Sequence, residues 1–157
     1  MKIAVYLAAP YGARDAIRSY ASELAAVNIE CTSSWLDEQD KIGAGTVGAA
    51  TDIDDQSAAL RVRKDFRDIG KAHILVLFTE SAAKALTVGG SSTSGGRHVE
   101  TGYALASGKR VIVVGTPENI FHRGAECTIV PDWHEALIEL IRTREQWRAE
   151  QPQAVDQ

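Results

Sequence analysis

Residues 74–78 read ILVLF, five apolar side chains in a row with no polar residue between them. Two more runs have a similar character, IAVYLAA at residues 3–9 and VIVV at residues 111–114. Strands that are apolar on both faces are typical of a parallel sheet covered by helices. Weaker runs at residues 29–32 and 128–130 supply two further candidate strands. The sequence therefore predicts a central, mostly parallel five-stranded sheet.

Segments of helical length separate these runs. Residues 14–27 are rich in alanine, residues 57–70 carry many charges, and residues 98–107 have one apolar stripe. The members of that stripe are Val99, Tyr103 and Ala106. The last helix is the best marked, because Asp132 is a good N-cap and Glu135 follows three residues later.

The alternation of strands and helices indicates an α/β fold with right-handed crossovers. We expect a flavodoxin-like or Rossmann-like three-layer sandwich with strand order 2-1-3-4-5. Residues 1–147 are predicted to form a single domain, followed by a polar tail at 148–157. Two segments interrupt the pattern, a Gly-, Ala- and Asp-rich stretch at 37–55 and the Gly/Ser loop TVGGSSTSGG at 87–96. A loop as long as the first is typical of a binding loop or lid.

The 157-residue chain carries 17 Lys and Arg against 21 Asp and Glu, a net charge of −4. This balance argues against a protein that binds a nucleic-acid polymer, which needs a basic surface. No apolar run approaches the roughly 20 residues of a membrane span, and the N-terminus lacks the basic region of a signal peptide. We therefore expect a cytoplasmic protein with no membrane partner, whose ligand is a small molecule.

The cysteines and histidines do not form a recognisable ligand pattern. Cys31 and Cys127 lie far apart in the sequence, so neither a disulfide framework nor a zinc cluster is expected. His122 and His134 have no partners at the spacing of metal ligands. The sequence thus predicts neither a metal ion nor another cofactor.

Sheets of this class bind ligands beyond the carboxyl ends of the strands, where the strand order reverses. For the expected topology this crevice lies between the first and third strands. The loops that meet there begin with APYG at 9–12 and at Thr79, and SGGRHVE at 94–100 opens the next helix. Small residues let backbone N–H groups approach a ligand, and a helix N-terminus favours an anion. A flexible turn explains the glycines equally well.

Three residues near this crevice are candidates for chemistry. Glu100 falls in the first turn of a helix, where a carboxylate also simply complements the helix dipole. Tyr6 interrupts an aliphatic strand, as a core tyrosine with a satisfied hydroxyl would. Asp65 lies on the helix that leads into the third strand, and Asp68 and Glu80 are alternatives to it.

Three stretches, VYLAAP at 5–10, KDFRDIGKAHILVLF at 64–78 and SGGRHVETGYALASGKRVIVVG at 94–115, resemble the nucleoside 2-deoxyribosyltransferase family. The resemblance covers roughly residues 2–115, and its most specific part is the Gly-rich turn, the glutamate and the GYAL that follows it. Members cleave or exchange the N-glycosidic bond of deoxynucleosides or of their 5′-monophosphates. The resemblance also implies a homodimer or higher assembly whose sites are completed by a neighbouring subunit.

Carried over residue by residue, the resemblance assigns the nucleophile to Glu100, the aspartate near the leaving base to Asp65, and the aromatic residue of the first strand to Tyr6. Glu100 would attack the sugar and form a glycosyl-enzyme intermediate. Asp65 would donate a proton to the base, and Tyr6 would orient Glu100. The candidates for binding substrate are Ser94, Gly95, Gly96, Arg97, Pro10, Tyr11 and Trp35. A core aromatic at a strand end is the stronger interpretation of Trp35.

The chain departs from the transferases six residues before Glu100, where they have an aspartate and this sequence has Ser94. The related deoxynucleoside 5′-monophosphate N-glycosidases have a phosphate-binding serine there. A hydroxyl suits a phosphate ester, whereas a carboxylate would repel it. Ser94 therefore favours a nucleotide substrate, although the run Ser92, Thr93 and Ser94 leaves the alignment open by one residue.

Other functions stay open at this point. A nucleoside 2-deoxyribosyltransferase that exchanges bases is the first alternative. Phosphoribohydrolases that resemble lysine decarboxylases also use a Gly-Gly turn and a glutamate, but Arg97 and His98 stand where their Gly-Thr pair is expected. A non-catalytic nucleotide-binding or sensing module is not excluded by fold, although a pure binder has no need of a nucleophile. The base and the sugar also remain open.

Overall fold

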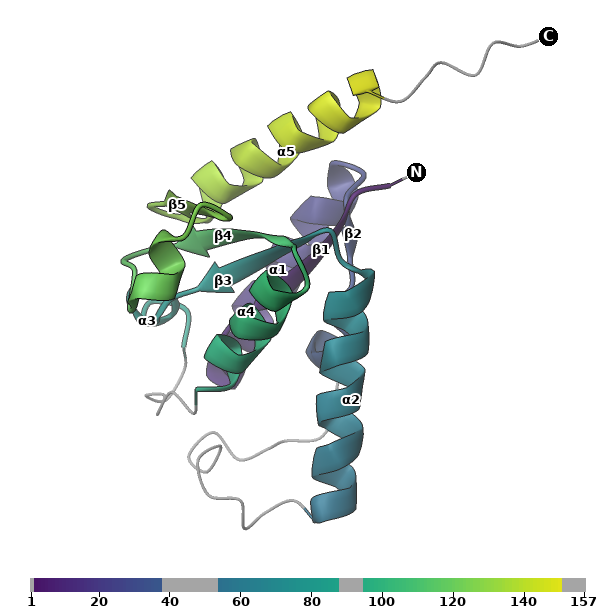
Figure 1. Cartoon of the computed structure of the whole chain (residues 1–157), viewed down its shortest axis with the longest axis vertical. Coiled ribbons are helices and arrows are strands. Elements are labelled where there is room, and N and C mark those ends of the chain that lie inside the picture. The colour runs from purple at the N-terminus through teal and green to yellow at the C-terminus, as the bar shows by residue number, and fades with distance from the viewer. Residues whose placement is uncertain (1, 38–53, 88–94, 151–157) are drawn as a thin grey trace, which may run out of the picture.

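The computed structural model describes residues 2–37, 54–87 and 95–150. Within these ranges five strands form one parallel sheet in the order β2-β1-β3-β4-β5 (Figure 1). The strands are β1 (Ala4–Ala8), β2 (Glu30–Cys31), β3 (Ile74–Phe78), β4 (Arg110–Val114) and β5 (Cys127–Val130). Every residue of β1 and β3 is buried, as their continuous apolar runs predict. The predicted fold class and strand order are confirmed.

Helices cover both faces of the sheet (Figure 1). On one face lie α1 (Arg14–Ala26) and α5 (Trp133–Glu150), where Tyr20 stacks on Trp133 with ring centroids 4.5 Å apart. On the other lie α2 (Asp55–Lys71) and α4 (Gly96–Ala106), joined by a stack of Phe66 on Tyr103 at the same centroid distance of 4.5 Å. The short elements are α3 (Glu80–Ala83), η1 (Tyr11–Ala13), η2 (Ser34–Asp37) and η3 (Ile120–Arg123).

Capping side chains set where two of the helices begin. The Asp132 carboxylate accepts a hydrogen bond from the Glu135 N–H at 3.0 Å, as the sequence predicts. Asp54 caps α2 in the same way, through the Ser57 N–H at 2.9 Å, so this helix begins before residue 57. At the other end of the chain α5 continues to Glu150, so the first three residues of the predicted tail at 148–157 are helical. Residues 151–157 lie outside the described ranges.

The apolar stripe predicted for α4 is not the face of the helix that the fold buries. Its three members, Val99, Tyr103 and Ala106, are all exposed, and Val99 is 61% exposed. The helix instead buries Arg97, Thr101 and Ala104. It can bury a polar face because Arg97 pairs with Glu118, and the Thr101 hydroxyl donates to the Arg97 carbonyl at 2.7 Å. The face that meets the sheet is therefore not the most apolar one.

No helix in the described part of the chain is both long enough and apolar enough to cross a bilayer.

Candidate active site

Tyr6 and Glu100 form the centre of the candidate site. Tyr6 lies in the middle of β1 and is fully buried, while Glu100 lies near the start of α4. The Tyr6 hydroxyl donates a hydrogen bond of 2.6 Å to Glu100 Oε1. Oε2 of Glu100 has no hydrogen-bond partner among the described residues. The fold thus fixes one oxygen of the carboxyl and leaves the other available for chemistry.

Asp65 acts on this pair from α2. Its negative charge raises the pKa of Tyr6 and that of Glu100, so it faces the same space. The two alternatives from the sequence are placed differently. Asp68 accepts hydrogen bonds from Ser34, and Glu80 is exposed at the start of α3. The charge of Asp68 also raises the pKa of Tyr6, but only that of Asp65 raises the pKa of Glu100 as well. Asp65 therefore stays the better candidate for the residue that acts with Glu100.

Glu100 holds its proton to a higher pH than an ordinary glutamate does. Burial of its carboxyl raises its pKa to about 8; the hydrogen bond from Tyr6 opposes this shift and the charge of Asp65 adds to it. The pKa of Tyr6 is also raised, chiefly by burial and then by the charge of Glu100. Tyr6 therefore stays a hydrogen-bond donor. Perturbed groups that share a space in this way are common at catalytic sites.

The start of α4 presents a glycine turn to the same region. Gly95 has φ +73°, a left-handed conformation that side chains other than glycine rarely adopt, and Gly96 is the first residue of the helix. Backbone N–H groups at such a terminus are donors for an anion. Ser94, the residue on which the choice of a nucleotide depends, lies outside the described residues, as does most of the predicted loop at 37–55.

Arg97 is engaged with an acidic partner. Its side chain is 4% exposed, and Nη2 donates to Glu118 Oε1 at 2.7 Å. The same oxygen accepts the Glu80 N–H at 2.8 Å, and these contacts hold the pKa of Glu118 below its ordinary value despite burial. Sequence reasoning missed Glu118, because nothing in its neighbourhood marks it as a partner of α4. The substrate role of Arg97 stays a prediction, with its charge already balanced by Glu118.

The aromatic candidates lie together beside β1. The rings of Tyr11 and Trp35 are 6.3 Å apart, and Pro10 precedes Tyr11 at the start of η1. The Tyr11 hydroxyl accepts from Arg14 Nη1 at 2.6 Å. Trp35 is 8% exposed, and its indole donates to the Leu7 carbonyl at 2.9 Å. These contacts are those of a core aromatic at the edge of the site.

His122 does have neighbours of the metal-ligating kind, contrary to the prediction from sequence spacing. His98, Glu118 and His122 place ligand atoms within 4.8 Å of one another. However, His122 Nδ1 accepts the Glu118 N–H at 3.1 Å, and buried His98 Nδ1 has no partner in the described residues. A metal-bound histidine donates its second N–H to an acceptor. Neither ring has that support, so the cluster is a poor fit for a metal ion.

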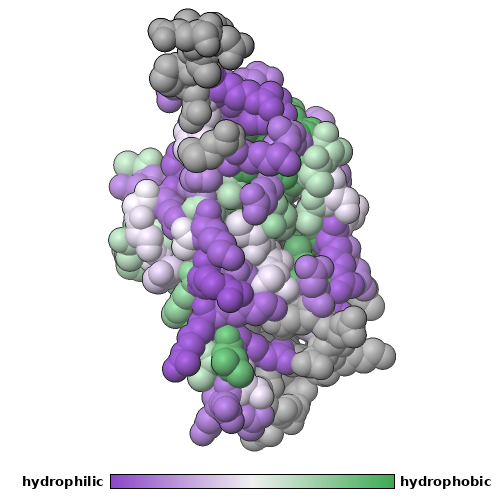
Figure 2. Space-filling model, turned by 90° about the vertical axis from the view of Figure 1, so that its right-hand side faces the viewer, coloured by the Kyte–Doolittle hydropathy of each residue, from purple (hydrophilic) through white to green (hydrophobic). Residues whose placement is uncertain are grey.

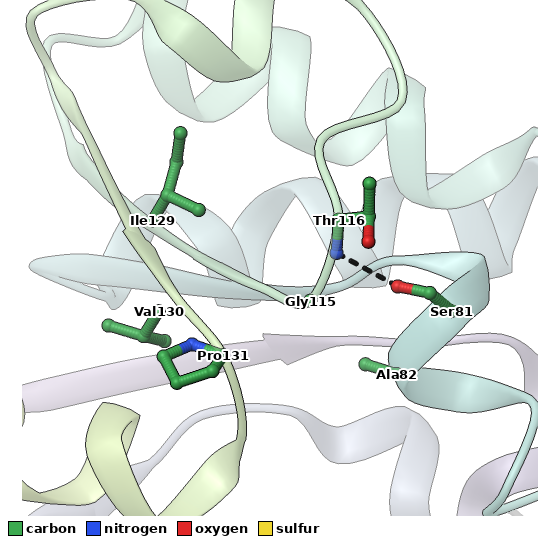
Figure 3. A pocket seen from close by; sticks show the side chains of 7 residues that line it. All are labelled: Ser81, Ala82, Gly115, Thr116, Ile129, Val130 and Pro131. Carbon is green, nitrogen blue, oxygen red and sulfur yellow. Dashed lines mark hydrogen bonds between the residues drawn. The ribbon is translucent and has the colours of Figure 1, made fainter.

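A separate hollow of about 560 Å³ lies at the ends of β4 and β5 (Figure 3). Its lining is formed by Ser81, Ala82, Gly115, Thr116, Ile129, Val130 and Pro131, which include none of the predicted site residues. Figure 3 shows the Ser81 hydroxyl accepting the Thr116 N–H, at 2.8 Å. Gly115 has φ +95°, and a Cβ there would lie 2.5 Å from Thr79 Oγ1. Glycine is therefore required where this hollow meets β4.

Comparison with known proteins adds evidence on the fold. No family model matches the chain, and no curated protein matches it. Among solved structures it is similar to the CMP N-glycosidase BcmB of Clostridium botulinum, with a TM-score of 0.51 and 16% sequence identity. The match covers 91% of this chain and 98% of that chain. At this identity the likeness concerns the fold alone, and it agrees with the three-layer α/β sandwich that the sequence predicts.

Proposed function

We propose that this protein cleaves the N-glycosidic bond of a nucleoside or deoxynucleoside 5′-monophosphate, with Glu100 as the nucleophile. The observation that carries the proposal is the hydrogen bond from buried Tyr6 to Glu100, beside Asp65. Burying two carboxyl groups near each other costs free energy. A protein that only binds a nucleotide gains nothing from that cost.

The first chemical step forms a covalent intermediate. Glu100 Oε2 attacks the anomeric carbon, the bond from that carbon to the base nitrogen breaks, and its electron pair goes to the base. At rest the pair holds one proton, on Glu100, and Asp65 is ionised. The positive charge that develops on the sugar favours the charged form of Glu100, so its proton passes to Asp65 as the reaction proceeds. Asp65 gives this proton to the base, which leaves neutral.

The second step regenerates the enzyme. Water attacks the same carbon, its proton passes to Asp65, and the bond to Glu100 breaks. The products are the free base and ribose or deoxyribose 5-phosphate. Throughout, the Tyr6 hydroxyl holds Oε1 and thereby aims Oε2 at the sugar, which is a positioning effect.

The choice of a monophosphate rests on the glycine turn at the start of α4. Gly95 and Gly96 open the helix, and the hydroxyl of Ser94 precedes them in the sequence. N–H groups and a hydroxyl are suitable donors to a phosphate ester. The structural neighbour described as a CMP N-glycosidase agrees with a nucleotide substrate.

The expected assembly comes from the resemblance to the deoxyribosyltransferases, whereas the expected location comes from the sequence, whose two cysteines suit a reducing compartment. We expect a homodimer or higher homo-oligomer in which a neighbouring subunit completes the site, acting in nucleotide salvage in the cytoplasm. Light scattering on the eluting protein would give its mass, and a monomer at enzyme-assay concentrations would contradict the dimeric site.

The test is a chromatographic screen of nucleosides and their 5′-monophosphates, ribo and deoxy, with and without an acceptor base. Release of free base without an acceptor supports the hydrolase. Exchange that requires the acceptor identifies a base transferase instead, and binding without turnover identifies a sensing module. Glu100→Gln should abolish release, whereas Glu135→Gln, an exposed glutamate on α5, is the matched control that should not.

A further inference from the structure

Few buried contacts hold α2, the helix that carries Asp65. Of its 17 residues only Asp68 and Ile69 are buried. Figure 2 shows the face on which α2 lies as mostly hydrophilic. Burial of apolar side chains therefore contributes little to holding α2 against the sheet. The position of the Asp65 carboxyl relative to Glu100 then depends on the polar and aromatic contacts that α2 makes close to Asp65.

Asp68 makes the most buried of these contacts. It lies one turn after Asp65, is 3% exposed, and its Oδ2 accepts hydrogen bonds from both the hydroxyl and the N–H of Ser34, the latter at 3.3 Å. Lys64 Nζ donates to the Ser34 carbonyl at 3.3 Å. Residues 64 and 68 are four apart on one helix face. Together they bind Ser34 through its side chain, its N–H and its carbonyl, an arrangement we call the Ser34 clamp.

The Ser34 clamp is anchored to β1 by the residues on either side of Ser34. The Ser33 hydroxyl accepts the Leu7 N–H at 2.6 Å, and the Trp35 indole donates to the Leu7 carbonyl at 2.9 Å. Leu7 is the residue after Tyr6. A continuous set of covalent and hydrogen bonds therefore connects the strand that carries Tyr6 with the helix that carries Asp65.

A second contact fixes α2 against α4. The Phe66 ring, next to Asp65 in the sequence, stacks on Tyr103, one turn after Glu100, with centroids 4.5 Å apart. Asp65 is thus placed between two attachments, the Ser34 clamp toward β1 and the ring stack toward α4.

We infer that Asp68 is a positioning residue, which through Ser34 holds Asp65 at the place beside Glu100 that proton transfer to the leaving base requires. The inference rests on the proposed function for its kinetic consequences. Asp68 itself does not act on the substrate, since Ser34 occupies Oδ2 and Oδ1 lies 3.5 Å from Arg67 Nε.

The kinetic test uses Asp68→Asn and Ser34→Ala, with Asp55→Asn as the control, an exposed aspartate at the start of the same helix. A misplacement of about 1 Å can reduce a rate about 100-fold. We expect Asp68→Asn to lower kcat about 10- to 100-fold with KM changed less than about twofold. Ser34→Ala should show a smaller loss of the same kind, and Asp55→Asn none.

Two comparisons separate positioning of Asp65 from a merely structural role. The loss should be smaller for an activated aryl glycoside, whose leaving group needs no proton. In an Asp65→Asn background, adding Asp68→Asn should cause no further loss, because the group it positions is gone. Losses that are equal for both substrates, or that add to those of Asp65→Asn, overturn the inference.

A second readout needs no turnover. Carbon NMR follows the titration of the Glu100 carboxyl, assigned by its disappearance in Glu100→Gln. Because the charge of Asp65 raises the pKa of Glu100, moving Asp65 away should lower the midpoint in Asp68→Asn and Ser34→Ala, but not when Asp65 is already asparagine. An unchanged midpoint overturns the inference. A shifted midpoint in a protein that cleaves no nucleotide retains it and rejects the proposed function. If Asp68→Asn does not fold, Ser34→Ala decides alone.

Discussion

The Tyr6 hydroxyl lies 2.6 Å from Glu100 Oε1, although 94 residues separate the two in the sequence. One comes from the centre of the sheet and the other from a helix that starts at a glycine turn. The environment raises the pKa of both groups, and for Glu100 this means that ionisation of its carboxyl destabilises the fold. Such a pair is more simply explained by chemistry than by folding, and four predictions follow from that view.

Tyr6→Phe should weaken the enzyme by changing how Glu100 titrates. The hydrogen bond from Tyr6 lowers the pKa of Glu100, so its loss should raise that pKa above about 8. The reactive form carries one proton on the Asp65–Glu100 pair, so kcat/KM of the wild type should fall as pH rises through the pKa of Glu100. In the variant this fall should occur at higher pH, and activity at neutral pH should drop about 10-fold, because the proton stays on Glu100 rather than on Asp65. Parallel pH–rate profiles test this, and a fall at the same pH in both proteins would contradict it.

Glu100→Gln should be inactive and yet more stable. The folded-state pKa of about 8 lies above the ordinary value of 4.5, so the folded protein holds this proton more tightly than the unfolded chain. Stability is therefore lost as pH rises from about 4.5 to about 8, by a free energy on the order of a few kcal/mol. Glutamine can still accept from Tyr6 without a charge.

Melting temperatures of wild type and Glu100→Gln across this pH range provide the measurement. The two curves should converge near pH 4.5 and separate toward pH 8, with the variant higher. Glu135→Gln serves again as the exposed control. Curves that stay parallel would show that Glu100 is not the group that titrates.

Asp65→Asn should affect substrates according to their leaving groups. A general acid contributes about 10²- to 10⁴-fold when the base needs its proton. The loss should therefore approach that range for an ordinary nucleotide and be much smaller for an activated aryl glycoside. Rates for both substrates with the same variant give the comparison. Equal losses would assign Asp65 to binding or to structure.

Ser94→Ala should weaken the use of a monophosphate and leave the matching nucleoside almost unaffected. A hydrogen bond to a charged group contributes roughly 1.5–3 kcal/mol, which corresponds to a loss of about 10- to 150-fold in kcat/KM. Ser94→Asp should reduce the preference for the monophosphate further, because a carboxylate repels the phosphate dianion. The monophosphate-to-nucleoside ratio is the quantity to measure. If wild type prefers the nucleoside, or the ratio stays constant, the transferase becomes the better proposal.

The sheet could be predicted from the sequence because a strand that is buried on both faces consists of consecutive apolar residues. The run at residues 74–78 is β3 with the same bounds, and the order of strands follows from the crossovers. The face of α4 could not be predicted in that way. Arg97 is buried only because Glu118, 21 residues later, reaches it, and no local period encodes that contact.

The site likewise contains some residues that the sequence marks and others that it leaves open. Tyr6 and Glu100 are visible in the sequence as a polar break in an aliphatic strand and as a carboxylate at a helix start. The resemblance selects Asp65, but the residues alone leave Asp68 open, since both occur on one helix three residues apart. One structural difference between them is Ser34, whose hydroxyl and N–H donate hydrogen bonds to Asp68.

The sparse burial of α2 has a consequence for dynamics. A helix with only two buried residues can separate from the sheet at a lower free energy than global unfolding. Amide hydrogens of α2 should therefore exchange with solvent through a local opening, well before those of β3, all of whose residues are buried. In each such opening the protein keeps its nucleophile and loses its acid. Activity in mild denaturant should accordingly decline before the sheet unfolds. The denaturant concentration at which activity is lost should match the one at which the amide hydrogens of α2 begin to exchange faster.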